Sequence, residues 1–175
     1  MSGHNKWSKI KHKKEKTDAQ KSKVFGKMVK FIQVEAKKAG GNLSSPGLKA
    51  AIEKAKAMNV PNDNIDRAIK KSAEAGETEL VVYEAYGPGG CAMIIEALTE
   101  NKNRANQEVK TILAKNGFAM AGIGSASWAF SHNPGEDWTP TSTIPLSDED
   151  GEKLGNLIEE LEESDEIQEV YTNAE

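Results

Sequence analysis

LVVYEAYGPGGCAMIIEAL, residues 80–98, is the stretch in which the hydrophobic pattern of the chain changes from a helical to an extended period. Residues 80–86 alternate loosely between apolar and polar side chains and are rich in Val and Tyr, which predicts a strand. Residues 87–90, GPGG, indicate a turn, and the apolar run at 91–98 predicts a second strand. A sheet is therefore expected to begin here, after a helical region.

Downstream of this stretch, helices and strands alternate. The expected elements are a helix at 103–116, strands at 125–130 and 141–146 around a loop at 131–140, a helix from Ser147 and a strand at 167–171. From Cys91 onward the order is β-α-β-β-α-β, which is typical of a ferredoxin-like domain, and residues 80–86 add one strand in front. The expected fold class is α+β, with helices covering one face of an antiparallel sheet.

Upstream, apolar residues recur at helical spacing in three short segments. The first begins at Thr17 and ends at Gly40-Gly41, the second follows Ser44-Ser45-Pro46, and the third runs from about Pro61 to Gly76. These segments predict a three-helix bundle. The expected domains are a flexible basic arm at 1–16, a helical domain at 17–76 and an α/β domain at 77–175.

Charge is strongly polarised along the chain, although the formal net charge is only -4. Residues 1–56 hold 15 Lys and Arg against 4 Asp and Glu, a net of +11, whereas residues 57–175 hold 8 against 23, a net of -15. One end of the chain therefore suits a polyanion and the other end would repel it.

The basic end combines lysines with an aromatic residue, Trp7, which can stack on a nucleobase while the lysines contact phosphates. The alternatives are a solvated basic tail without a partner and, for Trp7, docking onto the helical bundle. The candidate nucleic-acid-binding residues are Lys6, Trp7, Lys9, Lys11, His12, Lys13, Lys14, Lys16, Lys21, Lys23, Lys27, Lys30, Arg67, Lys70 and Arg104.

No catalytic constellation, metal cluster or nucleotide fingerprint is visible, so no enzyme activity, cofactor or metal is expected. Cys91 lies among apolar and glycine residues, which indicates a buried structural thiol. Residues 101–104, NKNR, precede a helix and indicate either ordinary N-capping by Asn103 or a phosphate site assisted by Arg104. The acidic run at 159–166 is interpreted as a solvated face.

No apolar run approaches the roughly 20 residues of a membrane span, and no apolar segment follows the basic start as in a secretory signal. The single cysteine excludes an internal disulfide. A cytoplasmic location is expected, with nucleic acid as the partner and neither a membrane nor a small-molecule substrate.

Several motifs together resemble the YebC family over nearly the whole chain. These motifs are SGHNKWSKIKHK at 2–13, NVPNDNIDRAI at 59–69, YEAYGPGG at 83–90, NKNR at 101–104 and VYTNA at 170–174. The resemblance implies a helical N-terminal domain followed by two α/β domains, the third inserted into the second. This chain departs from that pattern, since only Ser131–Pro140 stands where the third domain would be inserted.

The resemblance also implies a regulator of gene expression, because members are described as transcriptional regulators, as ribosome-associated factors, or as the mitochondrial translational activator of cytochrome c oxidase. The first hypothesis is a non-enzymatic factor that binds rRNA or tRNA on the ribosome. The second is a DNA-binding transcriptional regulator, in which the two helices around residues 59–61 act as a helix-turn-helix pair. An enzyme that uses Cys91 is the weakest hypothesis, for want of partner residues.

Overall fold

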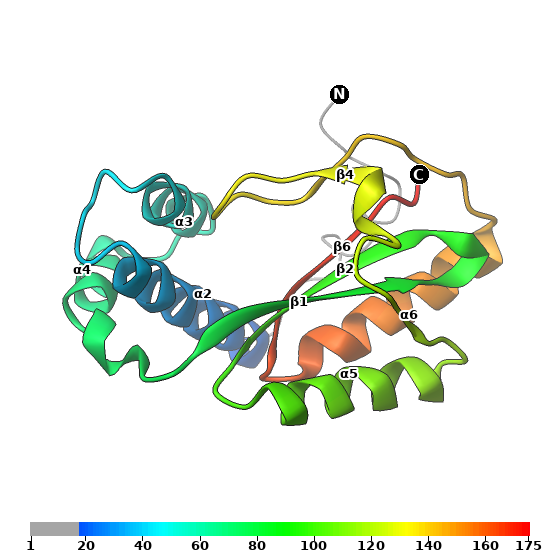
Figure 1. Ribbon diagram of the computed structural model, residues 1–175, viewed down its shortest axis with the longest axis horizontal. Helices are drawn as coiled ribbons and strands as arrows, with labels where there is room; N and C mark the ends of the chain where they lie inside the picture. Colours follow the sequence, from blue (N-terminus) through cyan, green and yellow to red (C-terminus); the bar gives the residue numbers. More distant parts are fainter. Residues whose placement is uncertain (1–17) are drawn as a thin grey trace. The chain divides into compact units, whose positions relative to one another are not determined.

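The computed structural model describes residues 18–175, so the predicted arm at 1–16 lies outside the described residues. Contacts divide the described chain into two units (Figure 1). The helical unit comprises residues 18–80 and 132–137, and the α/β unit comprises residues 81–131 and 138–175. The loop predicted at 131–140 therefore contributes most of its residues to the helical unit.

The helical unit contains a helix in each of the three predicted segments, but the third α-helix ends at Lys70 and not at Gly76 as predicted. The three helices are α2 (Asp18–Lys38), α3 (Pro46–Ala57) and α4 (Asn62–Lys70), followed by the short 3-10 helix η1 (Ser72–Ala75). Their apolar stripes meet in a core that includes Met28, Ile32, Leu48 and Ile65. Gly40 and Gly41, with positive φ, end α2 as predicted.

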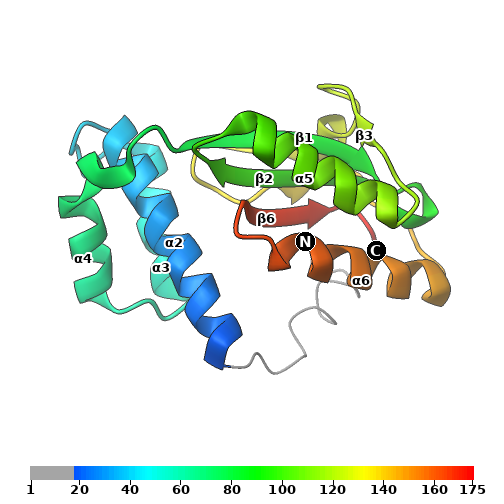
Figure 2. The same ribbon diagram turned by 90° about the horizontal axis from the view of Figure 1, so that it is seen from below.

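The α/β unit is built on a four-stranded sheet with the order β3-β1-β2-β6. Its elements are β1 (Glu79–Tyr86), η2 (Pro88–Gly90), β2 (Ala92–Thr99), α5 (Lys102–Lys115), β3 (Met120–Ala121), η3 (Ser127–Ala129), β4 (Phe130–Ser131), β5 (Thr139–Pro140), α6 (Asp148–Glu163) and β6 (Ile167–Thr172). Helices α5 and α6 lie on the same face of the sheet (Figure 2). The predicted α+β class is confirmed.

Both faces of the central strand β2 are covered, which explains why all eight of its residues are buried. Met93 and Ile95 point to the core formed with α5 and α6, where Leu113 and Leu157 are buried. On the other face, Ile94 belongs to a smaller apolar cluster. Its other buried members are Ala92, Ala126, Ala129 and Phe130, and Trp138 and Tyr171 are partly buried beside them. The continuous apolar run at 91–98 follows from this double coverage.

Two predicted strands are wrong. Residues 125–130 form η3 and only the first residue of β4, because backbone N–H groups there donate to the Glu84 carboxylate instead of a neighbouring strand. Residues 141–146 make one isolated bridge, between Ile144 and Ala174, while Ser142 accepts a hydrogen bond from the Asn173 side chain. Their backbone groups are satisfied by side chains and loops that the hydrophobic pattern does not reveal.

The ferredoxin-like arrangement is not confirmed. The strand that was expected as an addition, β1, lies inside the sheet between β3 and β2. The short β4 and β5 pair only with each other, in a separate two-stranded sheet. The predicted turn at 87–90 is present, since the Gly90 N–H donates to the Gly87 carbonyl at 3.0 Å. Gly89 has a φ of +69°, and a Cβ there would also collide with the Leu146 side chain.

Candidate nucleic-acid interface

Basic side chains are concentrated on the helices of the helical unit. Residues 18–71 contain twelve Lys and Arg against five Asp and Glu. The predicted candidates among them are Lys21, Lys23, Lys27 and Lys30 on α2, and Arg67 and Lys70 on α4. The sequence analysis did not predict Lys49 and Lys56 on α3, which are exposed like Lys21, Arg67 and Lys70. The candidate interface therefore extends over all three helices.

Several of these cations have no acidic partner. Within the described residues, no ion pair or side-chain hydrogen bond engages the charged groups of Lys21, Lys49, Lys56, Arg67 and Lys70. Lys54 is different, because it pairs with Asp137 at 2.6 Å. Lys23, Lys27 and Lys30 also have interactions within the molecule. The unpartnered cations are free to meet an external anion.

Basic residues of the α/β unit are mostly neutralised by its own acids. Arg104 pairs with Glu166 at 2.6 Å, and the closest nitrogen–oxygen distances are 2.7 Å for Lys115 with Glu160 and 2.8 Å for Lys153 with Glu149. These pairs connect α5 to the segment before β6, α5 to α6, and two turns of α6.

Arg104 is therefore already engaged, although it is one of the predicted nucleic-acid-binding residues. Its backbone N–H donates to the Asn101 side chain at 3.0 Å, so residues 101–104 cap α5 in the ordinary way. Capping is thus found, but the cap is Asn101 and not the predicted Asn103, which lies in the first turn of α5. The Arg104 guanidinium would have to leave Glu166 to contact a phosphate.

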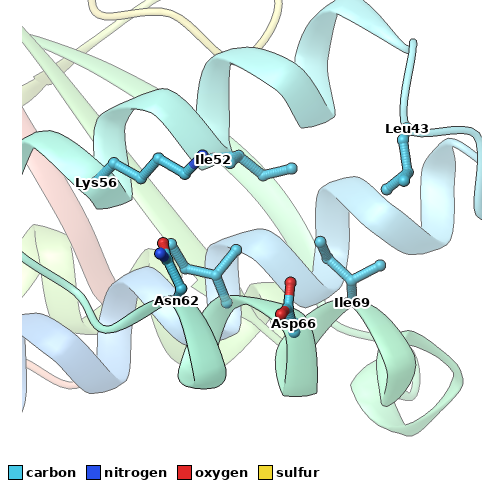
Figure 3. A pocket seen from close by; sticks show the side chains of 7 residues that line it. Leu43, Ile52, Lys56, Asn62, Asp66 and Ile69 are labelled. Carbon is cyan, nitrogen blue, oxygen red and sulfur yellow. The ribbon is translucent and has the colours of Figure 1, made fainter.

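Two hollows lie beside α4. One, of about 190 Å³, separates α4 from α2 and is lined by Val29, Gln33, Asn64, Arg67, Ala68 and Lys71. The other, of about 380 Å³, separates α4 from α3 and is lined by Leu43, Ile52, Lys56, Asn62, Ile65, Asp66 and Ile69 (Figure 3). The polar side chains of α4 are thus divided between two grooves.

The loop at 132–137 braces the start of α3 within the helical unit. Gly135, with a φ of +80°, lies so close to the Gly47 backbone that a Cβ on Gly135 would be 2.4 Å from the Gly47 carbonyl oxygen. The Lys54–Asp137 pair fixes the end of the same loop. The Asn-Pro-Gly signal predicted a turn here, but its contact with α3 has no signature in local sequence.

A second exposed surface, in the α/β unit, was not predicted. Of the five large apolar side chains exposed in the described chain, four belong to this unit. Val82 and Tyr86 lie on β1, and Ile123 and Trp128 lie in the loop between β3 and β4. Residues 116–135 contain no Asp, Glu, Lys or Arg. This surface is apolar, whereas the rest of the unit is acidic, and residues 116–135 offer no positive charge that could bind phosphate.

Glu84 holds this loop in place. Its carboxylate accepts hydrogen bonds from the backbone N–H groups of Gly124, Ala126 and Ser127 at 2.6, 3.0 and 2.6 Å. Burial raises the pKa of Glu84, but these hydrogen bonds outweigh burial and leave the pKa below its ordinary value. The Trp128 indole donates to the Tyr86 hydroxyl at 3.0 Å, so both aromatic side chains are also fixed.

Nothing in the described part of the chain assembles a reaction centre. Cys91 is fully buried, and burial raises the pKa of its thiol, which disfavours the nucleophilic thiolate. No cluster of three or more His, Cys, Asp or Glu suited to a metal occurs among residues 18–175. None of the described helices has the length and apolar character to cross a membrane.

Family models match almost the entire chain. The model described as the TACO1/YebC protein N-terminal domain matches residues 5–75. The model described as the TACO1/YebC second and third domain matches residues 78–134 and 135–174. The second match is interrupted between residues 134 and 135, inside the loop that braces α3.

Two relatives with similar sequences and one solved structure illustrate what the chain resembles. A "probable transcriptional regulatory protein" of Thermoanaerobacter pseudethanolicus is 38% identical over 239 aligned positions, which cover 100% of this chain and 97% of the relative. A protein of the same name from Leifsonia xyli is 44% identical over 183 positions, covering 95% and 72%. The crystal structure of a conserved hypothetical protein from Aquifex aeolicus has a TM-score of 0.77 and 32% identity, covering 97% of this chain and 96% of that one.

Proposed function

The chain belongs to the TACO1/YebC family, and on that premise we propose that it is a non-enzymatic regulator of gene expression that binds nucleic acid. The binding surface comprises the basic N-terminal residues and the cations of α2, α3 and α4. The protein acts in the cytoplasm and needs neither a cofactor nor a small-molecule substrate.

The observation that carries this proposal is the contrast in how cations are partnered. Lys49, Lys56, Arg67 and Lys70 have no acidic partner among the described residues, whereas Arg104, Lys115 and Lys153 are paired within the α/β unit. Unpaired cations at high local density repel one another, and a polyanion relieves this repulsion while releasing its counterions. The acidic α/β unit then faces away from the nucleic acid or contacts protein.

RNA on the ribosome, either rRNA or tRNA, is the favoured target. A DNA-reading helix presents its polar side chains together on one face toward the base edges. Helix α4 divides its polar side chains instead, with Asn62 and Asp66 in one groove and Asn64 and Arg67 in the other. Contacts to phosphates and unpaired bases, which dominate RNA recognition, do not require a continuous reading face.

We infer further that the third domain of the family is absent from this chain. The alignment with the Thermoanaerobacter protein has 239 positions for 175 residues, so at least 64 positions have no residue here. The interruption of the family match at 134/135 favours the site of the missing domain. Any activity that depends on that domain would be lost, while the basic surface is retained.

Sucrose-gradient sedimentation of a cell lysate tests the proposal. We expect the full chain to migrate with ribosomal particles at low salt and to leave them as salt rises, because phosphate contacts release counterions. Ribonuclease treatment is the control, since it should return the protein to the top of the gradient. A chain that stays at the top at every salt concentration contradicts a ribosomal target.

The second candidate function is DNA-binding transcriptional regulation, which the names of the relatives favour. An electrophoretic mobility-shift assay with promoter fragments separates it from the first. A shift of one fragment that survives excess non-specific duplex, together with no ribosomal association, would favour this second function.

A further inference from the structure

We propose that the hollow between α3 and α4 is a pocket for an unpaired nucleobase that carries an exocyclic amino group. This inference rests on the proposed nucleic-acid binding and names the part of the nucleic acid that this site takes. The pocket has a volume of about 380 Å³ and is open to solvent on the helical unit. Figure 3 shows Asn62, Asp66 and Ile69 rising from α4 toward α3.

The floor and sides of the pocket are apolar. Ile52 comes from α3, Ile69 comes from α4, and Leu43 enters from the loop before α3 (Figure 3). Ile65 of α4 also lines the pocket. Leu43 is 59% exposed and is the one large apolar side chain classed as exposed in the described part of the helical unit. Enzymes that extract a base from a stack hold its faces between aromatic or apolar side chains.

The polar rim of the pocket is uncommitted. Lys56, Asn62 and Asp66 line it, yet none of their side chains takes part in an ion pair or hydrogen bond within the described residues. The start of α4 does not use Asn62 as a cap. An ammonium, an amide and a carboxylate are therefore available at one apolar hollow.

These three groups match the parts of a nucleotide. The Asp66 carboxylate accepts hydrogen bonds and so suits the amino group of adenine, cytosine or guanine. The Asn62 amide both donates and accepts, and Lys56 can neutralise the adjoining phosphate. Uracil and thymine are disfavoured, because they present carbonyl oxygens where a carboxylate needs a donor.

The charge of the two helices that flank the pocket favours a polyanion as its occupant. Lys49, Lys56, Arg67 and Lys70 lie on α3 and α4 and have no acidic partner among the described residues. A phosphate backbone would be attracted to these helices, whereas an apolar peptide would leave their cations unpaired. The apolar hollow and the cations together therefore favour a single-stranded nucleic acid.

Fluorescence anisotropy of the full chain with labelled RNA oligonucleotides of equal length tests the pocket. The probes are oligo(A), oligo(C) and oligo(U). We expect oligo(A) and oligo(C) to bind about tenfold more tightly than oligo(U), since one base-specific pair is worth roughly 1–3 kcal/mol. Asp66→Asn should reduce this preference to within about twofold, because an amide can donate to the uracil carbonyl.

Asp63→Asn is the matched control. Asp63 lies on the same helix, is exposed and does not line the pocket, so its loss should raise affinity for all three probes equally and leave the preference intact. For each probe, the dissociation constant of the variant is divided by that of the wild type. This ratio removes the contribution of base stacking within the free oligonucleotide, which is the same for both proteins. Leu43→Ala, at an exposed position, should lower the affinity for oligo(A) and oligo(C) by about threefold to tenfold, because an apolar contact with the base is lost.

Each outcome decides the matter. Equal binding of the three probes by the wild type, or the same response to Asp66→Asn and Asp63→Asn, overturns the base pocket while leaving nucleic-acid binding in place. Failure to bind any oligonucleotide overturns the proposed function and the pocket together. Loss of the preference in Asp66→Asn alone supports the assignment.

Discussion

The helical unit and the α/β unit use their charged side chains in opposite ways. The α/β unit has sixteen acids for five cations and pairs Arg104, Lys115 and Lys153 internally. Residues 18–71 have twelve cations for five acids and leave several without an acidic partner in the described chain. The net charge of the whole chain, -4, conceals this difference, whereas the ion-pair partners of individual side chains reveal it.

The contrast separates charges that stabilise the fold from charges that are available for binding. An exposed ion pair contributes little to stability, about 0–1 kcal/mol, but it neutralises a cation that would otherwise attract phosphate. The α/β unit therefore reduces its own affinity for nucleic acid in two ways, through excess acid and through internal pairing. Four predictions follow from this comparison, beginning with the largest effect.

Removal of residues 2–16 should have the largest effect on nucleic-acid affinity. The segment contributes six lysines, and we expect a loss of about a hundredfold or more at moderate salt, with an unchanged fold. For the full chain, the logarithm of the binding constant should fall with the logarithm of salt concentration with a slope of about -4 or steeper.

Binding titrations over a salt series and circular dichroism of the shortened chain provide the measurement. A slope near -1 for the full chain would mean that the lysines are mostly solvated. Unchanged affinity of the shortened chain would place the whole interface on α2, α3 and α4.

Neutralising Lys49, Arg67 and Lys70 together, each to Gln, should weaken binding by about tenfold to thirtyfold and reduce the salt slope by roughly 2 to 3. The fold should be retained, since all three residues are exposed and lack acidic partners in the described chain. The control is the double variant Lys115→Gln and Lys153→Gln, which removes paired cations from the other unit. An equal loss of nucleic-acid affinity in the two variants would contradict the distinction between paired and unpaired cations.

The local sequence pattern predicts a helix or strand well where the burial of each side chain depends only on its position within that element. Spacing of apolar residues located α2, α3, α4, α5 and α6, and the apolar run at 91–98 located β2. The same pattern failed at 125–130, because Glu84, forty residues earlier, takes the backbone N–H groups that a strand would use. A buried carboxylate that organises a distant loop has no periodic signal.

The candidate site divides in the same way. Charge counting found the basic helices, because excess charge is a property of the sequence alone. It could not distinguish Arg67 from Arg104, since only the fold brings Glu166 to Arg104. It also missed the pocket, which depends on Leu43, Ile52 and Ile69 meeting across a turn and two helices.

The third prediction concerns a charge that stabilises the α/β unit. Glu84→Gln should lower the free energy of unfolding by about 2 kcal/mol near neutral pH, because the carboxylate loses charge-assisted hydrogen bonds to three backbone N–H groups. Nucleic-acid affinity should be unchanged. Urea denaturation is the measurement, and Glu77→Gln, at an exposed position, is the control.

The pH dependence of this effect has a definite sign. The pKa of Glu84 in the folded protein lies below its ordinary value, so the carboxylate stabilises the fold above the ordinary pKa. That contribution is lost as the pH falls through the pKa of the folded protein, when Glu84 is protonated. The difference in stability between wild type and Glu84→Gln should therefore shrink in acid; a constant difference from neutral to acidic pH would contradict the role of the charge.

The smallest expected effect belongs to Arg104, and it tests the comparison residue against residue. Arg104→Gln should leave nucleic-acid affinity within about twofold of the wild type, because Glu166 already holds the guanidinium at 2.6 Å and the surrounding unit is acidic. Its cost in stability should be roughly 0.2–1 kcal/mol, as for other partly exposed pairs. Arg67→Gln is the matched change on the helical unit, and it should weaken binding about threefold to fivefold without a measurable change in stability.

Titrations at one low salt concentration and thermal unfolding of both variants separate the two cases. If Arg104→Gln weakens binding as much as Arg67→Gln does, then internal pairing does not withdraw a cation from the interface. The division between stabilising and binding charges would then have to be abandoned.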